Sequence, residues 1–193
     1  MPSHHYEHPR ELCSGKLPNK SKILGIVIPF VFLADQLTKH LILKFVSLGD
    51  SFPVIPGIFD IVHTRNKGAA FGFLAGTADS FRLPFFFIVS AVALTLITVY
   101  FFRLKDPRRS IYLCLALILG GALGNIYDRI FLGEVVDFIS FHWYDKIVHW
   151  EIAGGWLRFR LEWPAFNIAD SAISIAVVWL MFLLSSTKTT AKA

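Results

Sequence analysis

Long apolar stretches, separated by more polar segments, dominate the pattern of this chain. A membrane-spanning helix needs about 20 consecutive and mostly apolar residues. Four windows meet that length, at residues 23–45, 83–102, 111–131 and 168–184. The sequence therefore predicts four membrane-spanning helices in one membrane domain at 22–186, with connections at 46–82 and 132–167 and short tails at 1–21 and 187–193.

The two connections carry the signals of a small β-structure. Residues 58–64 have the composition of a strand, and residues 156–163 alternate between apolar and charged positions, as a strand with one apolar face does. Residues 145–152 can form its partner, with a turn at 153–155. We therefore expect an α-helical integral membrane protein with a small β-hairpin in its second connection.

Tryptophan is concentrated in the second connection, which holds four of the five in the chain, at positions 143, 150, 156 and 163. Trp is enriched at membrane interfaces, where its amphipathic ring lies at the level of the lipid headgroups. One interpretation is an interfacial anchor. The other is that the hairpin helps to hold a membrane-bound substrate over a site, and the two are compatible.

Charge supplies an orientation and removes several function classes. Ten lysines and arginines lie in residues 1–22, in the short loop at 103–109 and in the C-terminal tail, whereas the longer segments 44–82 and 132–166 hold seven. The positive-inside rule then places both termini in the cytoplasm and the long connections outside. The net charge of +5 reflects this anchoring, so no nucleic-acid partner is expected. Only 17% of the residues are charged, against about a quarter in soluble domains.

Two aspartates stand where apolar segments meet the outer surface. Asp137 follows the third window and Asp170 begins the fourth. A carboxylate at membrane depth is costly and is by default a candidate functional site. For Asp170 alone, the bland interpretation is a favourable charge in a first helical turn behind an Asn167 N-cap. Two convergent carboxyl groups, however, can share one proton and act as base and acid.

Other polar residues lie within or at the ends of the spans. Asp35 and Lys39 are spaced i,i+4, and the favoured interpretation is an ion pair that holds helices together. Gly120 and Gly124 form a small-residue face that allows close helix approach. One turn further on, a polar group lines either a site or a buried network; its members are Asn125, Asp128 and Arg129.

Five motifs, in this order, resemble those of the lipoprotein signal peptidases (signal peptidase II). They are Asp35-Gln-Leu-Thr-Lys39, Asn66-Lys-Gly-Ala-Ala-Phe71, Gly120-Gly-Ala-Leu-Gly-Asn-Ile-Tyr-Asp-Arg129, Gly133-Glu-Val-Val-Asp-Phe138 and Phe166-Asn-Ile-Ala-Asp-Ser171. The resemblance covers about residues 23–186. It implies four transmembrane helices with a small extracytoplasmic β-cradle or hairpin. It also implies an aspartyl membrane endopeptidase of the inner membrane, with its active site at the outer face.

The resemblance also assigns roles to residues by motif position. Asp137 and Asp170 match the catalytic dyad, Asp35 and Lys39 match structural polar positions, and no metal or other cofactor is implied. The supporting or substrate-binding positions are Asn66, Gly68, Asn125, Asp128, Arg129, Asn167 and Ala169. Two features depart from the family pattern, namely Lys67, where many members carry an uncharged residue, and the long segment 139–165.

The partners implied by the resemblance are lipid-modified prolipoprotein signal peptides and membrane lipids, with the enzyme acting as a monomer. The cut falls just before a cysteine that carries diacylglycerol. In the expected mechanism the ionised Asp takes a proton from water, which attacks the peptide carbonyl. The protonated partner polarises that carbonyl and later protonates the leaving amine.

An alternative class is a proton-coupled transporter, since carboxylates in membranes also mark ion paths. Against it, the sequence has no inverted repeat, and its carboxylates gather at one surface. A metalloprotease is weaker still, because no His-Glu-x-x-His motif occurs.

Overall fold

Four helices and a four-stranded antiparallel sheet make up the computed structural model, which describes residues 19–67, 79–106, 108–152 and 155–189. The helices are α1 (Lys20–Phe45), α2 (Asp79–Arg103), α3 (Arg109–Phe131) and α4 (Ile168–Thr189). The strands are β1 (Ser51–Ile55), β2 (Phe59–Asn66), β3 (Val135–Ile152) and β4 (Gly155–Glu162), in that order across the sheet. The expected fold class, four helices with a small β-structure, is confirmed.

Three of the helices described are long and apolar enough to cross a membrane, namely α1, α3 and α4. In α2 the apolar run is shorter, at Phe87–Arg103. The helices begin close to the expected positions, and the differences are local. For example, α1 begins at Lys20 because the Asn19 side chain accepts a hydrogen bond from the Lys22 backbone N–H, 3.1 Å away, which caps the helix.

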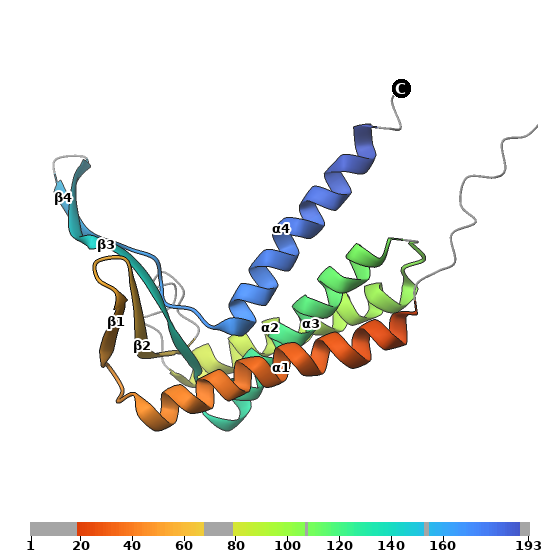
Figure 1. Cartoon of the computed structure of the whole chain (residues 1–193), viewed down its shortest axis with the longest axis horizontal. Coiled ribbons are helices and arrows are strands. Elements are labelled where there is room, and N and C mark those ends of the chain that lie inside the picture. The colour runs from red at the N-terminus through yellow and green to blue at the C-terminus, as the bar shows by residue number, and fades with distance from the viewer. Residues whose placement is uncertain (1–18, 68–78, 107, 153–154, 190–193) are drawn as a thin grey trace, which may run out of the picture.

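Helix α3 is the centre of the bundle. Most of its span is buried, whereas only small fractions of the α1 and α4 spans are, and their large apolar side chains face outward as lipid-facing residues do. The sheet lies at the end of the bundle where α1 ends and α4 begins, called the sheet end below (Figure 1).

Glycines on α3 allow this close packing. A Cβ on Gly120 would lie 2.9 Å from the Val31 Cβ of α1, and one on Gly121 would lie 2.6 Å from the Ala169 carbonyl oxygen of α4. Real Cβ atoms essentially never come that close, so these positions need glycine at the present helix separations. The expected small-residue face is therefore confirmed toward α1, and Gly121 extends it toward α4.

The sheet is tied to the helices through β3. Val136 and Phe138 of β3 are buried and form a core cluster with Ile42 of α1, against which Ile168 of α4 also packs. Asp137 lies between these two apolar residues, so the packing of β3 holds its backbone at the junction of α1 and α4.

The predicted strands are confirmed in position. Residues 58–64 fall largely in β2, and the predicted hairpin forms, with residues 145–152 in the second half of β3 paired to β4. Of the predicted turn, residues 153 and 154 lie outside the described part of the chain, and Gly155 already belongs to β4. The extra length of segment 139–165 is thus accounted for by one long hairpin.

Candidate active site

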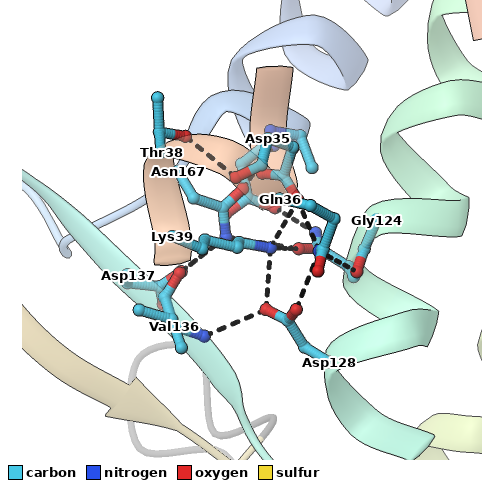
Figure 2. Close-up of polar contacts among 12 residues, drawn as sticks. Asp35, Gln36, Thr38, Lys39, Gly124, Asp128, Val136, Asp137 and Asn167 are labelled. Carbon is cyan, nitrogen blue, oxygen red and sulfur yellow. Dashed lines mark hydrogen bonds and ion pairs between the residues drawn. The ribbon is translucent and has the colours of Figure 1, made fainter. Parts of the chain in front are cut away.

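A buried polar cluster fills the bundle at its sheet end (Figure 2). Its aspartates are contributed by α1, α3, β3 and α4, so no single element builds it. Among the fully or nearly fully buried polar side chains are Asp35, Lys39, Asn125, Asp128, Asp137 and Asn167.

Lys39 is the hub of the part of the cluster formed by Asp35, Asn125 and Asp128. Its Nζ lies 2.8 Å from Asp35 Oδ2, 2.8 Å from Asp128 Oδ2 and 3.0 Å from Asn125 Oδ1. The predicted Asp35–Lys39 ion pair is therefore present, and the sequence did not reveal that Asp128 shares the same lysine. A buried charge requires such pairing, since an isolated one would cost several kcal/mol.

The Lys39 ammonium group also fixes the orientation of the Asn125 amide. An ammonium group can only donate, so the Asn125 oxygen must face it and the amide nitrogen must point the other way. That nitrogen donates to Asp170 Oδ1 over 2.7 Å. One candidate catalytic carboxyl group is thus linked to the Lys39 hub through a single side chain.

Asn167 plays the matching part for Asp137. Its Oδ1 accepts the Asp170 backbone N–H at 2.9 Å, which is the predicted N-cap of α4. Its nitrogen therefore points away from the helix and donates to Asp137 Oδ1 at 2.7 Å, with a longer contact of 3.2 Å to Asn125 Oδ1. The two asparagines join the two aspartates in one hydrogen-bond chain.

Asp137 lies outside the spans, in a site that favours its protonated form. The pKa of this carboxyl group is raised from 3.8 to about 7, chiefly by burial and then by the nearby negative charge of Asp170. Hydrogen bonds from Asn66 and Asn167 and the charge of Lys39 oppose this shift. Asp137 can therefore hold a proton near neutral pH beside a second carboxyl group, which is what paired acid–base chemistry requires.

The remaining predicted residues surround this pair in different ways. Asn66 is the last residue of β2, opposite Val135, and its side chain forms a hydrogen bond with Asp137. The positive charge of Arg129 acts on both Asp137 and Asp170. The Arg129 Nη1 donates to the Asn125 backbone carbonyl at 3.1 Å. Ala169 is fully buried, and its N–H donates to Asp35 Oδ1 at 2.9 Å. Gly68 lies outside the described residues.

Gln36 is a member of the cluster that sequence reasoning did not single out. Its Nε2 donates to Asp128 Oδ1 at 2.9 Å and lies 3.2 Å from Asp35 Oδ2. It thereby joins Asp35 and Asp128, the same two carboxyl groups that Lys39 contacts. The available signal was an uncharged polar residue next to Asp35 inside an otherwise apolar span.

Comparison with known proteins identifies the family of this chain. The family model for signal peptidase (SPase) II matches residues 27–186. The chain belongs to the signal peptidase II family. It is therefore a peptidase, a hydrolase, built as a multi-pass membrane protein, and its family supports a role in the removal of signal peptides from prolipoproteins.

Individual relatives cover most of the chain. A lipoprotein signal peptidase of Geobacter sulfurreducens is 46% identical over 82% of this chain and 89% of the relative. That of Syntrophotalea carbinolica is 43% identical over 83% of this chain and 89% of the relative, and that of Staphylococcus aureus is 38% identical over 82% and 85%.

Solved structures agree as well. One described as a bacterial membrane enzyme is 32% identical, with a TM-score of 0.69, over 88% of this chain and 91% of its own. A second with the same description is 34% identical, with a TM-score of 0.67, over 90% and 97%.

Proposed function

We propose that this member of the signal peptidase II family is an aspartyl endopeptidase that uses Asp137 and Asp170 to activate water. The observation that carries the proposal is the chain of hydrogen bonds that joins the two carboxyl groups through Asn125 and Asn167, both held in fixed orientations. Fixed neighbours matter because a general base must lie within hydrogen-bond reach of the proton it removes.

The two carboxyl groups take different roles. Asp137 holds the proton, because its pKa is about 7. Asp170 takes the role of the base, since it lies in the first turn of α4, where N–H groups and the helix dipole favour a negative charge. The Arg129 charge also lies close enough to act on Asp170, and the Asn125 amide donates to its Oδ1.

The reaction then balances with one proton shared between the pair. Asp170 removes a proton from water, and the hydroxyl group bonds to the scissile carbonyl carbon, which Asp137 polarises by hydrogen bonding. The peptide C–N bond breaks as the Asp137 proton passes to the leaving amine. One proton remains, now on Asp170, and its return to Asp137 restores the starting state.

The proposed substrate is a diacylglyceryl-modified prolipoprotein, cut just before the lipid-bearing cysteine. Its lipid chains would supply much of the binding, since burial of a methylene contributes about 0.8 kcal/mol. The proposed orientation has both termini in the cytoplasm and the sheet end at the outer face of the inner membrane. This places the dyad on the side of the membrane to which a lipoprotein is exported.

The direct test is cleavage of such a prolipoprotein by purified protein in detergent with a chelator present. The wild type and Asp137→Asn are compared, with Asp50→Asn as the matched control, since Asp50 is an exposed aspartate beside the sheet. We expect cleavage before the cysteine by the wild type and the control, and none by Asp137→Asn. Loss of wild-type cleavage on chelation, or full activity of Asp137→Asn, would refute the aspartyl mechanism.

A further inference from the structure

The β3–β4 hairpin extends well beyond the rest of the sheet. Pairing of β3 with β2 ends at Phe141, whereas pairing with β4 continues from Ile147 to Ile152. Residues 145–152 and 155–162, called the arm below, therefore form a two-stranded ribbon at the edge of the sheet. In Figure 1 the arm leaves the sheet end on the side of α4, at an angle to α1 and away from the helices.

The strand register gives the arm one apolar face. Residues directly opposite each other in an antiparallel pair share a face, and faces alternate along each strand. Trp150 is opposite Leu157, and Val148 is opposite Phe159. Because both pairs are two residues apart on each strand, all four positions belong to one face.

The other face of the arm has a different character. Each of its cross-strand pairs includes a charged residue: Ile147–Arg160, His149–Arg158 and Glu151–Trp156. The arm is thus amphipathic across both strands. The alternation of residues 156–163 alone indicated an apolar face only for β4.

Such a ribbon needs a surface to cover its apolar face. A two-stranded hairpin is at best marginally stable in water, and β4 is an edge strand whose partner in the sheet is β3. We propose that the arm lies on the membrane, with its apolar face in the interfacial region of the leaflet at the sheet end.

Two observations favour lipid as the occupant. Figure 1 shows the arm turned to the side of the bundle on which α4 lies, rather than continuing along the axis of α1. A ribbon in this direction can lie over the bilayer that would surround the helices. Its base carries Trp143 and Trp163, which are 55% and 64% exposed, and Trp is the residue typical of the membrane interface.

The base of the arm is built to set its direction. Tyr144 has a φ of +44°, which is uncommon for a bulky residue, and its N–H donates to the Gly57 carbonyl at 2.7 Å. The Tyr144 ring lies so close to Gly57 that a Cβ there would be 2.5 Å from Cδ1. A strained residue locked against the β1–β2 turn fixes the angle at which β3 leaves the sheet.

The test measures the depth of spin labels in the full-length protein. Cys13→Ser leaves Cys114, which is buried, as the only cysteine, and a single labelled cysteine is then introduced by Leu157→Cys or, as the matched control, Arg158→Cys. The protein is placed in nanodiscs of phosphatidylethanolamine with some phosphatidylglycerol. Relaxation by oxygen, which concentrates in lipid, is compared with relaxation by a water-soluble nickel chelate.

We expect the label at 157 to be relaxed several-fold more by oxygen than by nickel, and the label at 158 to show the reverse. Val148→Cys and His149→Cys repeat the comparison on the other strand, so one misfolded variant cannot decide the result. Equal nickel access at 157 and 158 would overturn the proposal. So would a label at 157 that loses nickel access only when a diacylglyceryl lipopeptide is added to the Asp170→Asn protein, since substrate would then be the occupant.

A second pair of variants tests the base. Gly57→Ala and Gly49→Ala each place a side chain at a positive φ, of +80° and +90°, but only the first also meets Tyr144. We expect Gly57→Ala to reduce the contrast between labels at 157 and 158, and Gly49→Ala to retain it. Unchanged contrast in Gly57→Ala would refute the role of Tyr144 in aiming the arm. Neither readout depends on catalysis, so the result stands apart from that of the cleavage assay.

Discussion

Two pairs of aspartates lie in the same buried cluster, and they are held in opposite ways. Asp35 and Asp128 both contact the Lys39 ammonium group at 2.8 Å, so they share one positive charge. Asp137 and Asp170 instead accept hydrogen bonds from neutral asparagine amides.

The difference shows how one cluster can combine stability with reactivity. A carboxyl group that contacts a buried ammonium group is fixed in place by that contact. Asp137 is buried beside a second carboxyl group, which raises its pKa to about 7 and lets it hold a proton. The first pair therefore builds the site, and the second pair is available for proposed proton transfer.

The largest expected effect is the loss of catalysis without loss of fold in Asp170→Asn. The new amide oxygen can still accept the bond from Asn125, so the thermal midpoint should stay near that of the wild type. The turnover number should fall by about 10²–10⁴-fold, the usual contribution of a positioned acid or base. Turnover and thermal unfolding are measured on the same preparation, and turnover within a few-fold of the wild type would exclude Asp170 as the base.

Removal of the shared cation should act on stability first. Lys39→Met leaves two buried carboxylates without their partner, which costs about 3–5 kcal/mol for a broken buried pair. The matched control is Lys44→Met, an exposed lysine in the last turn of the same helix, for which little change is expected. Denaturant unfolding in detergent measures both, and equal costs would mean that Lys39 does not stabilise the cluster.

A smaller effect should follow from filling the space beside Asp35. A Cβ on Gly124 would lie 2.5 Å from Asp35 Oδ2, so Gly124→Ala must push the carboxylate or separate α1 from α3. The expected cost is about 1–3 kcal/mol, as for other overpacked cores. Gly25→Ala is the control because nothing lies within 4 Å of its Cβ, and a neutral or stabilising change is expected there. If the two variants were equally stable, the close approach at Gly124 would be of no consequence.

The smallest effect concerns the pH dependence of turnover, which distinguishes Asp137 from Asp170. The pKa of Asp137 is about 7, so turnover should fall up to tenfold per pH unit above that value as the proton is lost. Asp35→Asn, if it folds, should keep this basic limb, because it does not alter the carboxyl group that holds the proton. A turnover profile that stays flat from pH 6 to about 9 would contradict the assignment of Asp137 as the acid.

The same shift predicts a change in stability with pH. The folded protein keeps the Asp137 proton up to about pH 7, whereas an ordinary aspartate with a pKa of 3.8 releases it much earlier. The folded state therefore binds more protons between these values, and its contribution to the free energy of unfolding is lost as pH rises from about 4 to about 7. Asp137→Asn should remove this part of the pH dependence of thermal unfolding.

How much of this site could be predicted follows from the range of each interaction. The spans and strands were predictable because apolar runs and alternation are local patterns, and so was the Asn167 cap. Asp137 and Asp170 were predictable as neighbours because the third span ends, and the fourth begins, on the same side of the membrane.

The contacts of Lys39 and of Gln36 with Asp128 were not predictable. They join residues 89 and 92 positions apart and depend on how α1 and α3 are rotated about their own axes. An apolar window fixes where a helix lies in a membrane but leaves that rotation open. The i,i+4 pair of Asp35 and Lys39 was visible because it lies within one helix.

The bond from the Ala169 N–H to Asp35 also bears on the order in which the protein is made. It connects α1, which leaves the ribosome first, to the opening turn of α4, which leaves last, across 134 residues. Until α4 enters the membrane, Asp170 is absent from the cluster, and Asp35 lacks the hydrogen bond from the Ala169 N–H. The nascent chain thus carries only part of the proposed catalytic cluster until α4 is made, and completion of the cluster coincides with completion of the membrane bundle.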